Sequence, residues 1–209
     1  MADDGATPTS AELQRVVEGL PWPNVRGKRC LGIGPADWEL DLELKRRGAA
    51  EVVTVDLQDH DEISALDPEM AGSFDVVVCI DLVRLDRDPL GALEAVRRVT
   101  TGVLLSVEPV ELWTSVLARG RPLFTLHGDD GERRGFSFNG AGHKHLLTGA
   151  GFTVERVSRP FVVPSDVPVA LDPTWRDRVT TLGTRVVTRS RERGRLHRAL
   201  LARPTGAMS

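Results

Sequence analysis

Hydrophobic residues along this chain gather in short continuous runs, separated by stretches with helical spacing. This pattern predicts strands that alternate with helices. Four runs are apolar enough to form buried strands of a parallel sheet, namely residues 28–34, 51–57, 74–80 and 102–107. Because helical patterns separate most of these runs, their order is that of a doubly wound α/β domain.

Three predicted helices carry start or stop signals in the sequence. Thr9 and Glu12 form a capping-box pattern at the start of the first helix. Asp88 followed by Pro89 offers an N-cap and then a proline at the first helical position. The helix that follows the first strand is predicted to end at Gly48, since glycine is the usual residue after a helix C-terminus.

The C-terminal half of the chain has a different pattern. Residues 120–135 are rich in glycine, proline and acidic residues, and we expect a loop or lid there. Asn139 is predicted to cap a further helix. Residues 152–158 alternate like an antiparallel edge strand, and residues 196–202 are predicted to pair back into the sheet. The prediction is therefore a parallel sheet with an antiparallel edge.

The length of 209 residues and the net charge of -3 fit a single domain. The acidic and polar start lacks the apolar core of a signal peptide, and no apolar run is long enough to span a membrane. We therefore expect a cytoplasmic protein. The predicted divisions are a disordered segment 1–8, one domain 9–203 (an N-terminal helix 9–20, a cofactor half 27–118 and an acceptor or lid half 119–203) and a tail 204–209.

Two compositional features change this picture only slightly. Cys30 and Cys79 lie inside predicted strands, so we interpret them as small core residues rather than a disulfide or a metal pair. Arginines are concentrated in residues 176–203. They form either a solvated surface or a site for the phosphates of RNA, and the small net charge favours neither interpretation.

The turn after the first strand carries candidate binding chemistry. It contains Gly32, Gly34, Asp37 and Trp38, and the second strand ends at Asp56. An acidic residue at the tip of the second strand is typical of domains that hydrogen-bond a ribose. Gly34 suits the tight turn between strand and helix, whereas Asp37 either contacts a ligand or caps the helix.

Further candidates follow the later strands. Asp81 and Glu108 each come directly after an apolar run, at the edge where open α/β sheets bind ligands. Asp81 is predicted to contact a cofactor or to act as a general base, with an exposed loop carboxylate as the alternative. His143 and His145 lie two apart on a predicted helix, so they point to different faces and do not share a metal. One of them, His143, is a candidate general base, and we expect no metal site.

Four segments together resemble the class I S-adenosylmethionine-dependent methyltransferases: residues 36–57, 74–100, 102–109 and 136–160. Within that superfamily they are most similar to the group related to the bacterial enzymes that complete 5-oxyacetyl wobble uridine in tRNA. The resemblance implies a Rossmann-like, mostly parallel seven-stranded sheet with an antiparallel C-terminal edge strand. It also implies S-adenosylmethionine as cofactor, bound by Gly32, Gly34, Asp37, Asp56, Leu57 and Asp81.

The chain departs from the pattern of these methyltransferases at three positions. Gly32 stands where they have an acidic residue, Trp38 where they have a glycine, and Leu85 where they have a histidine. A carboxylate at position 32 would be expected to hold the methionine amino group of the cofactor, a contact worth about 1.5–3 kcal/mol.

The function implied by the resemblance is methyl transfer to a small molecule or a nucleoside. The three departures favour a different class as the alternative, a catalytically inactive fold that binds a partner. A third candidate is RNA modification, with the arginines of residues 176–203 on the RNA phosphates. A nicotinamide-dependent enzyme is disfavoured, because the turn lacks the third glycine that binds dinucleotides.

Overall fold

The computed structural model describes residues 10–56, 63, 66, 72–85, 88–111, 114, 118, 120–127, 135–164 and 194–206. This part of the chain is built on a seven-stranded sheet in the order β2-β1-β3-β4-β9-β7, with β8 also paired to β9. The strands are β1 (Arg29–Gly34), β2 (Glu51–Asp56), β3 (Phe74–Ile80), β4 (Thr100–Pro109), β7 (Phe152–Val157), β8 (Phe161–Pro164) and β9 (Gly194–Pro204). β1 to β4 are parallel, whereas β9 is antiparallel to its neighbours. The predicted fold class is therefore confirmed.

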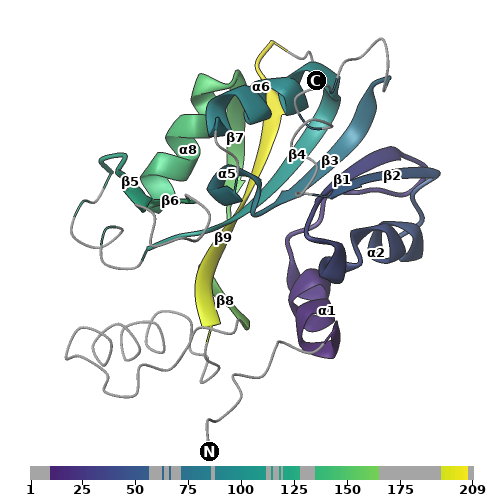
Figure 1. Cartoon of the computed structure of the whole chain (residues 1–209). Helices are drawn as coiled ribbons and strands as arrows, with labels where there is room; N and C mark the ends of the chain where they lie inside the picture. The colour runs from purple at the N-terminus through teal and green to yellow at the C-terminus, as the bar shows by residue number, and fades with distance from the viewer. Residues whose placement is uncertain are drawn as a thin grey trace, which may run out of the picture.

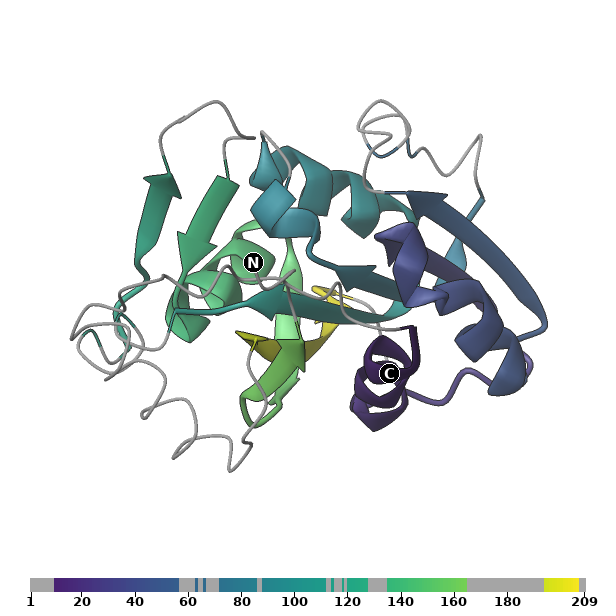
Figure 2. The same ribbon diagram turned by 60° about the horizontal axis from the view of Figure 1, so that its bottom comes forward.

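Helices cover both faces of this sheet (Figure 1, Figure 2). One face carries α1 (Ser10–Gly19), the short 3-10 helix η1 (Ala36–Trp38) and α2 (Leu40–Arg46), and the other carries α5 (Leu82–Leu85), α6 (Pro89–Val99) and α8 (Gly140–Gly149). Each face has its own apolar core cluster, so the fold has three layers. Among the described residues, no helix is long and apolar enough to cross a membrane.

The C-terminal strand β9 confirms the strand predicted at residues 196–202. It lies between β4 and the flank formed by β7 and β8, so β7 is the edge strand expected at residues 152–158. The register pairs Pro109 of β4 with His197 of β9. This pairing places the first half of β9 next to the carboxyl end of β4, where open α/β sheets bind ligands.

The prediction of a loop or lid at residues 120–135 is wrong in part. Described residues there form β5 (Phe124–His127), which pairs with β6 (Gly135–Phe138) as a separate hairpin. Phe124 lies opposite Phe138, with ring centroids 6.4 Å apart. Strands of four residues are too short to give a clear alternating pattern, and the neighbouring glycines and prolines obscured it.

Several local predictions are confirmed by hydrogen bonds and burial. The Asp88 carboxylate accepts a bond from the Gly91 N–H at 3.0 Å and so caps α6. Asn139 caps α8 in the same way, because its side-chain oxygen accepts from the Gly142 N–H at 2.8 Å. Cys30 and Cys79 are both fully buried, one in each core cluster, so they are core residues on opposite faces of the sheet.

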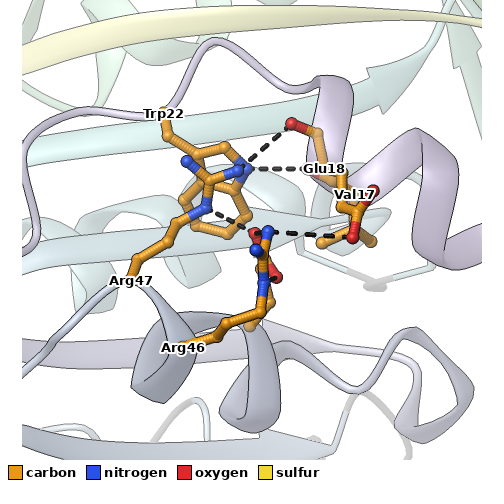
Figure 3. Close-up of polar contacts among 6 residues, drawn as sticks. Val17, Glu18, Trp22, Arg46 and Arg47 are labelled. Carbon is orange, nitrogen blue, oxygen red and sulfur yellow. Dashed lines mark hydrogen bonds and ion pairs between the residues drawn. The ribbon is translucent and has the colours of Figure 1, made fainter.

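Two arginines at the end of α2, both paired with a buried carboxylate, connect α2 to α1 on one face of the sheet (Figure 3). Glu43 is only 5% exposed and accepts hydrogen bonds from Arg46 and Arg47. Arg47 also donates to the carbonyl oxygen of Glu18 on α1 at 3.1 Å, and its guanidinium lies 4.7 Å from the ring centroid of Trp22. The C-terminal end of α2 is therefore held against α1.

Candidate functional site

A cavity of about 240 Å³ opens at the carboxyl ends of β1 and β2. It is lined by the ends of both strands, the turn after β1 and the first residues of α2: Gly32, Gly34, Pro35, Ala36, Leu40, Asp41, Thr54, Val55 and Asp56. Pockets for small ligands typically measure about 300–1,000 Å³, so this cavity holds part of a nucleoside-sized molecule rather than all of it.

Two glycines lie close to α2 on the floor of this cavity. A Cβ atom at Gly34 would lie 3.1 Å from Cδ1 of Leu40, and one at Gly32 would lie 3.3 Å from Cβ of Leu40. A side chain at either position would therefore press on α2 or fill the cavity. The two glycines predicted to bind a cofactor lie together and keep the backbone of β1 accessible from this side.

Asp56 lies where the sequence predicted it. It is the last residue of β2, half-buried, opposite Gly34 in the strand register, and it lines the cavity. This is the position from which a carboxylate can accept two hydrogen bonds from a ribose. Three of the predicted binding residues, Gly32, Gly34 and Asp56, are thus brought to one site.

Trp38 does not obstruct this site. Its side chain is 6% exposed and packs in the core cluster of the α1 face, with Leu13 and Val17 of α1. The backbone accommodates this arrangement because η1 forms a tight turn and Glu39 adopts a left-handed conformation, with φ of 46°. A tryptophan can therefore stand at this position instead of a glycine, because its side chain faces the core and does not line the cavity.

A carboxylate that the sequence analysis missed lines the same cavity. Asp41 lies in the first turn of α2 and lines the cavity together with Asp56, and its side chain is paired with Lys45 at 3.4 Å. Asp41 therefore supplies the cavity with a carboxylate, which Gly32 lacks. The only sequence signal was its position one residue after the buried Leu40, where acidic residues are common at helix starts.

Asp81 directly follows β3 and adopts a left-handed backbone conformation, with φ of 60°. Its N–H donates to the carbonyl of Val107 at 3.0 Å, and its Oδ1 accepts from Nε2 of His197 at 3.1 Å. The side chain is thus nearly buried rather than an exposed loop carboxylate, since Asp81 is 9% exposed. His197, 116 positions away in sequence, had no signal that singled it out.

His143 lies in the core on the other face of the sheet. It is 0% exposed, and its Nε2 is hydrogen-bonded to Oγ of Ser106 at 2.8 Å. Burial, together with the nearby positive charge of Arg198, lowers the pKa of His143 to about 3. A fully buried imidazole with such a pKa is a poor acceptor for a substrate proton, so this geometry favours a structural role over the predicted general base.

The remaining predicted residues are only partly covered by the structure. Leu57 and the side chains of Asp37 and Leu85 lie outside the described residues, as do most of residues 176–203. Within that arginine-rich region, Arg203 forms an ion pair with Glu155 at 2.8 Å. Among the described residues, no group of three or more histidine, cysteine or acidic side chains is placed to hold a metal ion.

Solved structures show where this fold occurs. An S-adenosylmethionine-dependent methyltransferase from Mesorhizobium loti is similar with a TM-score of 0.51 at 15% identity, covering 87% of this chain and 93% of that one. A 1,6-didemethyltoxoflavin-N1-methyltransferase from Burkholderia thailandensis, with bound S-adenosylhomocysteine, gives 0.54 at 16%, covering 94% and 76%. The [4+2]-cyclase SpnF gives 0.52 at 15%, covering 94% and 81%.

These similarities define the class of fold. The chain has the α/β Rossmann-like fold of methyltransferases, with a mostly parallel sheet and an antiparallel flank. No protein-family model matches the sequence, and no curated protein matches it. The cyclase shows that this fold is also found in proteins named for other chemistry, so the function has to be argued from the site.

Proposed function

We propose that the protein is an S-adenosylmethionine-dependent methyltransferase that acts on a small molecule or a nucleoside. The observation that carries the proposal is the cavity at the ends of β1 and β2, which has a glycine floor and the Asp56 carboxylate at its rim. That combination suits a nucleoside, since the glycines admit the ligand and the carboxylate accepts from ribose hydroxyls. The methyltransferase neighbours, one with bound S-adenosylhomocysteine, support the same ligand.

The residues of this chain can be assigned roles on that basis. Asp56 binds the ribose, and Gly32 and Gly34 let the ligand approach the backbone of β1. Asp41 lies at the cavity wall and takes the part of the acidic residue that position 32 lacks, by pairing with the amino group of the methionine moiety. The bound cofactor supplies an activated methyl group, and the protein mainly aligns the acceptor with it.

The alternative is a catalytically inactive methyltransferase fold that serves as a binding module. The observation that favours it is Gly32, which has no carboxylate and whose Cβ position is already 3.3 Å from Leu40. RNA modification through residues 176–203 and the finer resemblance to the tRNA wobble-uridine group stay predictions. Salt-dependent RNA binding, weakened when Arg189, Arg191 and Arg193 are changed together, would be the sign of that function.

Calorimetric titration with S-adenosylhomocysteine tests the proposal. Asp56→Asn should weaken binding about tenfold or more, because hydrogen bonds to a carboxylate are worth about 1.5–3 kcal/mol. Glu51→Gln is the matched control, since Glu51 lies at the other end of β2 and pairs with Arg29 on the surface. A wild-type protein that binds neither S-adenosylhomocysteine nor S-adenosylmethionine at millimolar concentration would refute the proposal and favour the inactive fold.

A further inference from the structure

A buried acid–imidazole pair joins the ends of β3 and β9 across β4. Nε2 of His197 donates to Oδ1 of Asp81 at 3.1 Å, and the two residues are 2% and 9% exposed. β9 reaches this place because it returns antiparallel to β4, with His197 opposite Pro109. The C-terminal strand thus delivers a side chain to the ligand-binding edge of the sheet.

His197 is held rigidly. Its Nδ1 faces the carbonyl oxygen of Arg195 at 3.1 Å, and its ring stacks on Phe161 of β8 with centroids 6.2 Å apart. Both ring nitrogens therefore face oxygen atoms, and these contacts fix the orientation of the imidazole. The ring in turn holds the Asp81 carboxylate in place.

The backbone of Asp81 also shows that its position is imposed. A left-handed conformation at a residue other than glycine is strained, although aspartate tolerates it better than most. Such strain persists where the surroundings over-determine the residue, and it is concentrated at functional sites. Here the backbone bond to Val107 and the side-chain bond to His197 hold Asp81 from two different strands.

Asp81 lies beside the proposed donor cavity. Ile80, the residue before it, has its carbonyl oxygen 3.7 Å from the Cβ position of Gly34, on the cavity floor. Adjacent strands are about 4.8 Å apart, so Asp56 on β2 and Asp81 after β3 are separated by roughly 10 Å across β1. A nucleoside whose ribose binds Asp56 would extend its sulfonium end over β1 toward β3.

We infer that His197 is a positioning residue of the methyl-donor site: it holds the Asp81 carboxylate where it faces the positively charged sulfonium of S-adenosylmethionine. The inference rests on the proposed function. It assigns a role to the C-terminal strand, which otherwise only completes the sheet. It also predicts a specific preference, because S-adenosylhomocysteine has the same nucleoside and amino-acid parts but no charge on sulfur. The Asp81 carboxylate should favour the charged ligand over the neutral one.

The test compares the dissociation constants of S-adenosylmethionine and S-adenosylhomocysteine by calorimetry, without any acceptor. Asp81→Asn should weaken S-adenosylmethionine binding about tenfold while changing S-adenosylhomocysteine binding less than about twofold. Asparagine also tolerates the left-handed backbone, so the variant should keep its fold. His197→Phe should likewise weaken S-adenosylmethionine binding more than S-adenosylhomocysteine binding. This variant keeps an aromatic ring on Phe161 but removes the N–H that donates to Asp81.

Two further variants separate positioning from mere structural support. His197→Gln retains an N–H that can reach Asp81, and it should restore most of the preference for the charged ligand. In the double variant Asp81→Asn/His197→Phe, the change at 197 should have no further effect on the ratio, because residue 197 acts through Asp81. His145→Gln, an exposed histidine on α8, is the control.

The outcomes are distinguishable. If the wild type binds both ligands and the ratio of the two dissociation constants is the same in the folded Asp81→Asn and His197→Phe variants as in the wild type, the inference is overturned while the proposed function stands. If the wild type binds neither ligand, the proposed function fails and the inference fails with it. The inference is supported if the preference for S-adenosylmethionine over S-adenosylhomocysteine is reduced in Asp81→Asn and in His197→Phe, and is largely retained in His197→Gln.

Discussion

Each face of the sheet buries an ionisable side chain beneath a helix, Glu43 on one face and His143 on the other, and the two side chains have different partners. On the α1 and α2 face, Glu43 accepts hydrogen bonds from Arg46 and Arg47. On the α8 face, His143 is bonded to Ser106, and among the described residues its Nδ1 has no hydrogen-bond partner. The first group is kept charged and the second is kept neutral.

The difference is visible in the pKa of each group. Burial alone would raise the pKa of Glu43, but the hydrogen bonds and charges of Arg46 and Arg47 outweigh it, and the pKa is lowered. Burial lowers the pKa of His143 to about 3, and the charge of Arg198 adds to the effect. The charged group on one face therefore belongs to the contacts between α2 and α1, whereas the neutral group on the other face belongs to the core.

The largest predicted effect concerns Trp38, on the face of the sheet that carries α1 and α2. Trp38→Gly should lower the free energy of unfolding by about 3–5 kcal/mol, since it removes a buried aromatic side chain. It should not improve cofactor binding, because the indole does not line the cavity. Denaturant unfolding and calorimetry measure the two effects, with Trp38→Phe as the milder control. A stable variant that binds S-adenosylhomocysteine more tightly would show that the indole obstructs the site.

The second prediction concerns His143 and acid stability. The unfolded chain takes up a proton near the ordinary pKa of 6.5, whereas the folded protein does so only near 3, so stability is lost as the pH falls between these values. The resulting loss is about 2 kcal/mol between pH 7 and pH 5. His143→Gln should remove this part of the pH dependence, as followed by urea unfolding. Exposed His145, two residues along α8, gives the control His145→Gln, which should keep it.

The smallest effect is predicted for Glu43, in a lower pH window. Its folded pKa lies below the ordinary value of 4.5, so its contribution is present above that value and is lost as the pH falls through the folded pKa. Glu43→Gln should destabilise the protein by on the order of 1 kcal/mol at neutral pH, because its arginine partners are partly exposed and screened. Thermal melts from neutral pH downward would show the difference from wild type shrinking. A constant difference at all pH values would contradict this account.

The sequence predicted what local signals determine. Runs of apolar residues identified β1 to β4, and the caps at Asp88 and Asn139 marked the starts of two helices, because these depend on neighbouring residues only. The direction of the Trp38 side chain depends instead on its packing against α1. Sequence spacing alone does not report such packing.

The candidate site was predicted only in part for the same reason. Gly32, Gly34 and Asp56 follow from the strand–turn–helix–strand order, and they do line one cavity. The partner of Asp81 comes from a strand that returns antiparallel near the end of the chain, and no local pattern joins them. His143 had the residue type of a general base, but its burial depends on tertiary packing against Phe138 and Ser106.

The most direct test of the central claim is a crystal structure of the protein with S-adenosylhomocysteine. The account predicts the nucleoside in the cavity over Gly32 and Gly34, with its ribose hydroxyls within hydrogen-bond distance of Asp56 and its sulfur toward Asp81. A ligand bound elsewhere, or a cavity that stays empty in crystals grown with saturating ligand, would contradict the assignment of this cavity as the donor site.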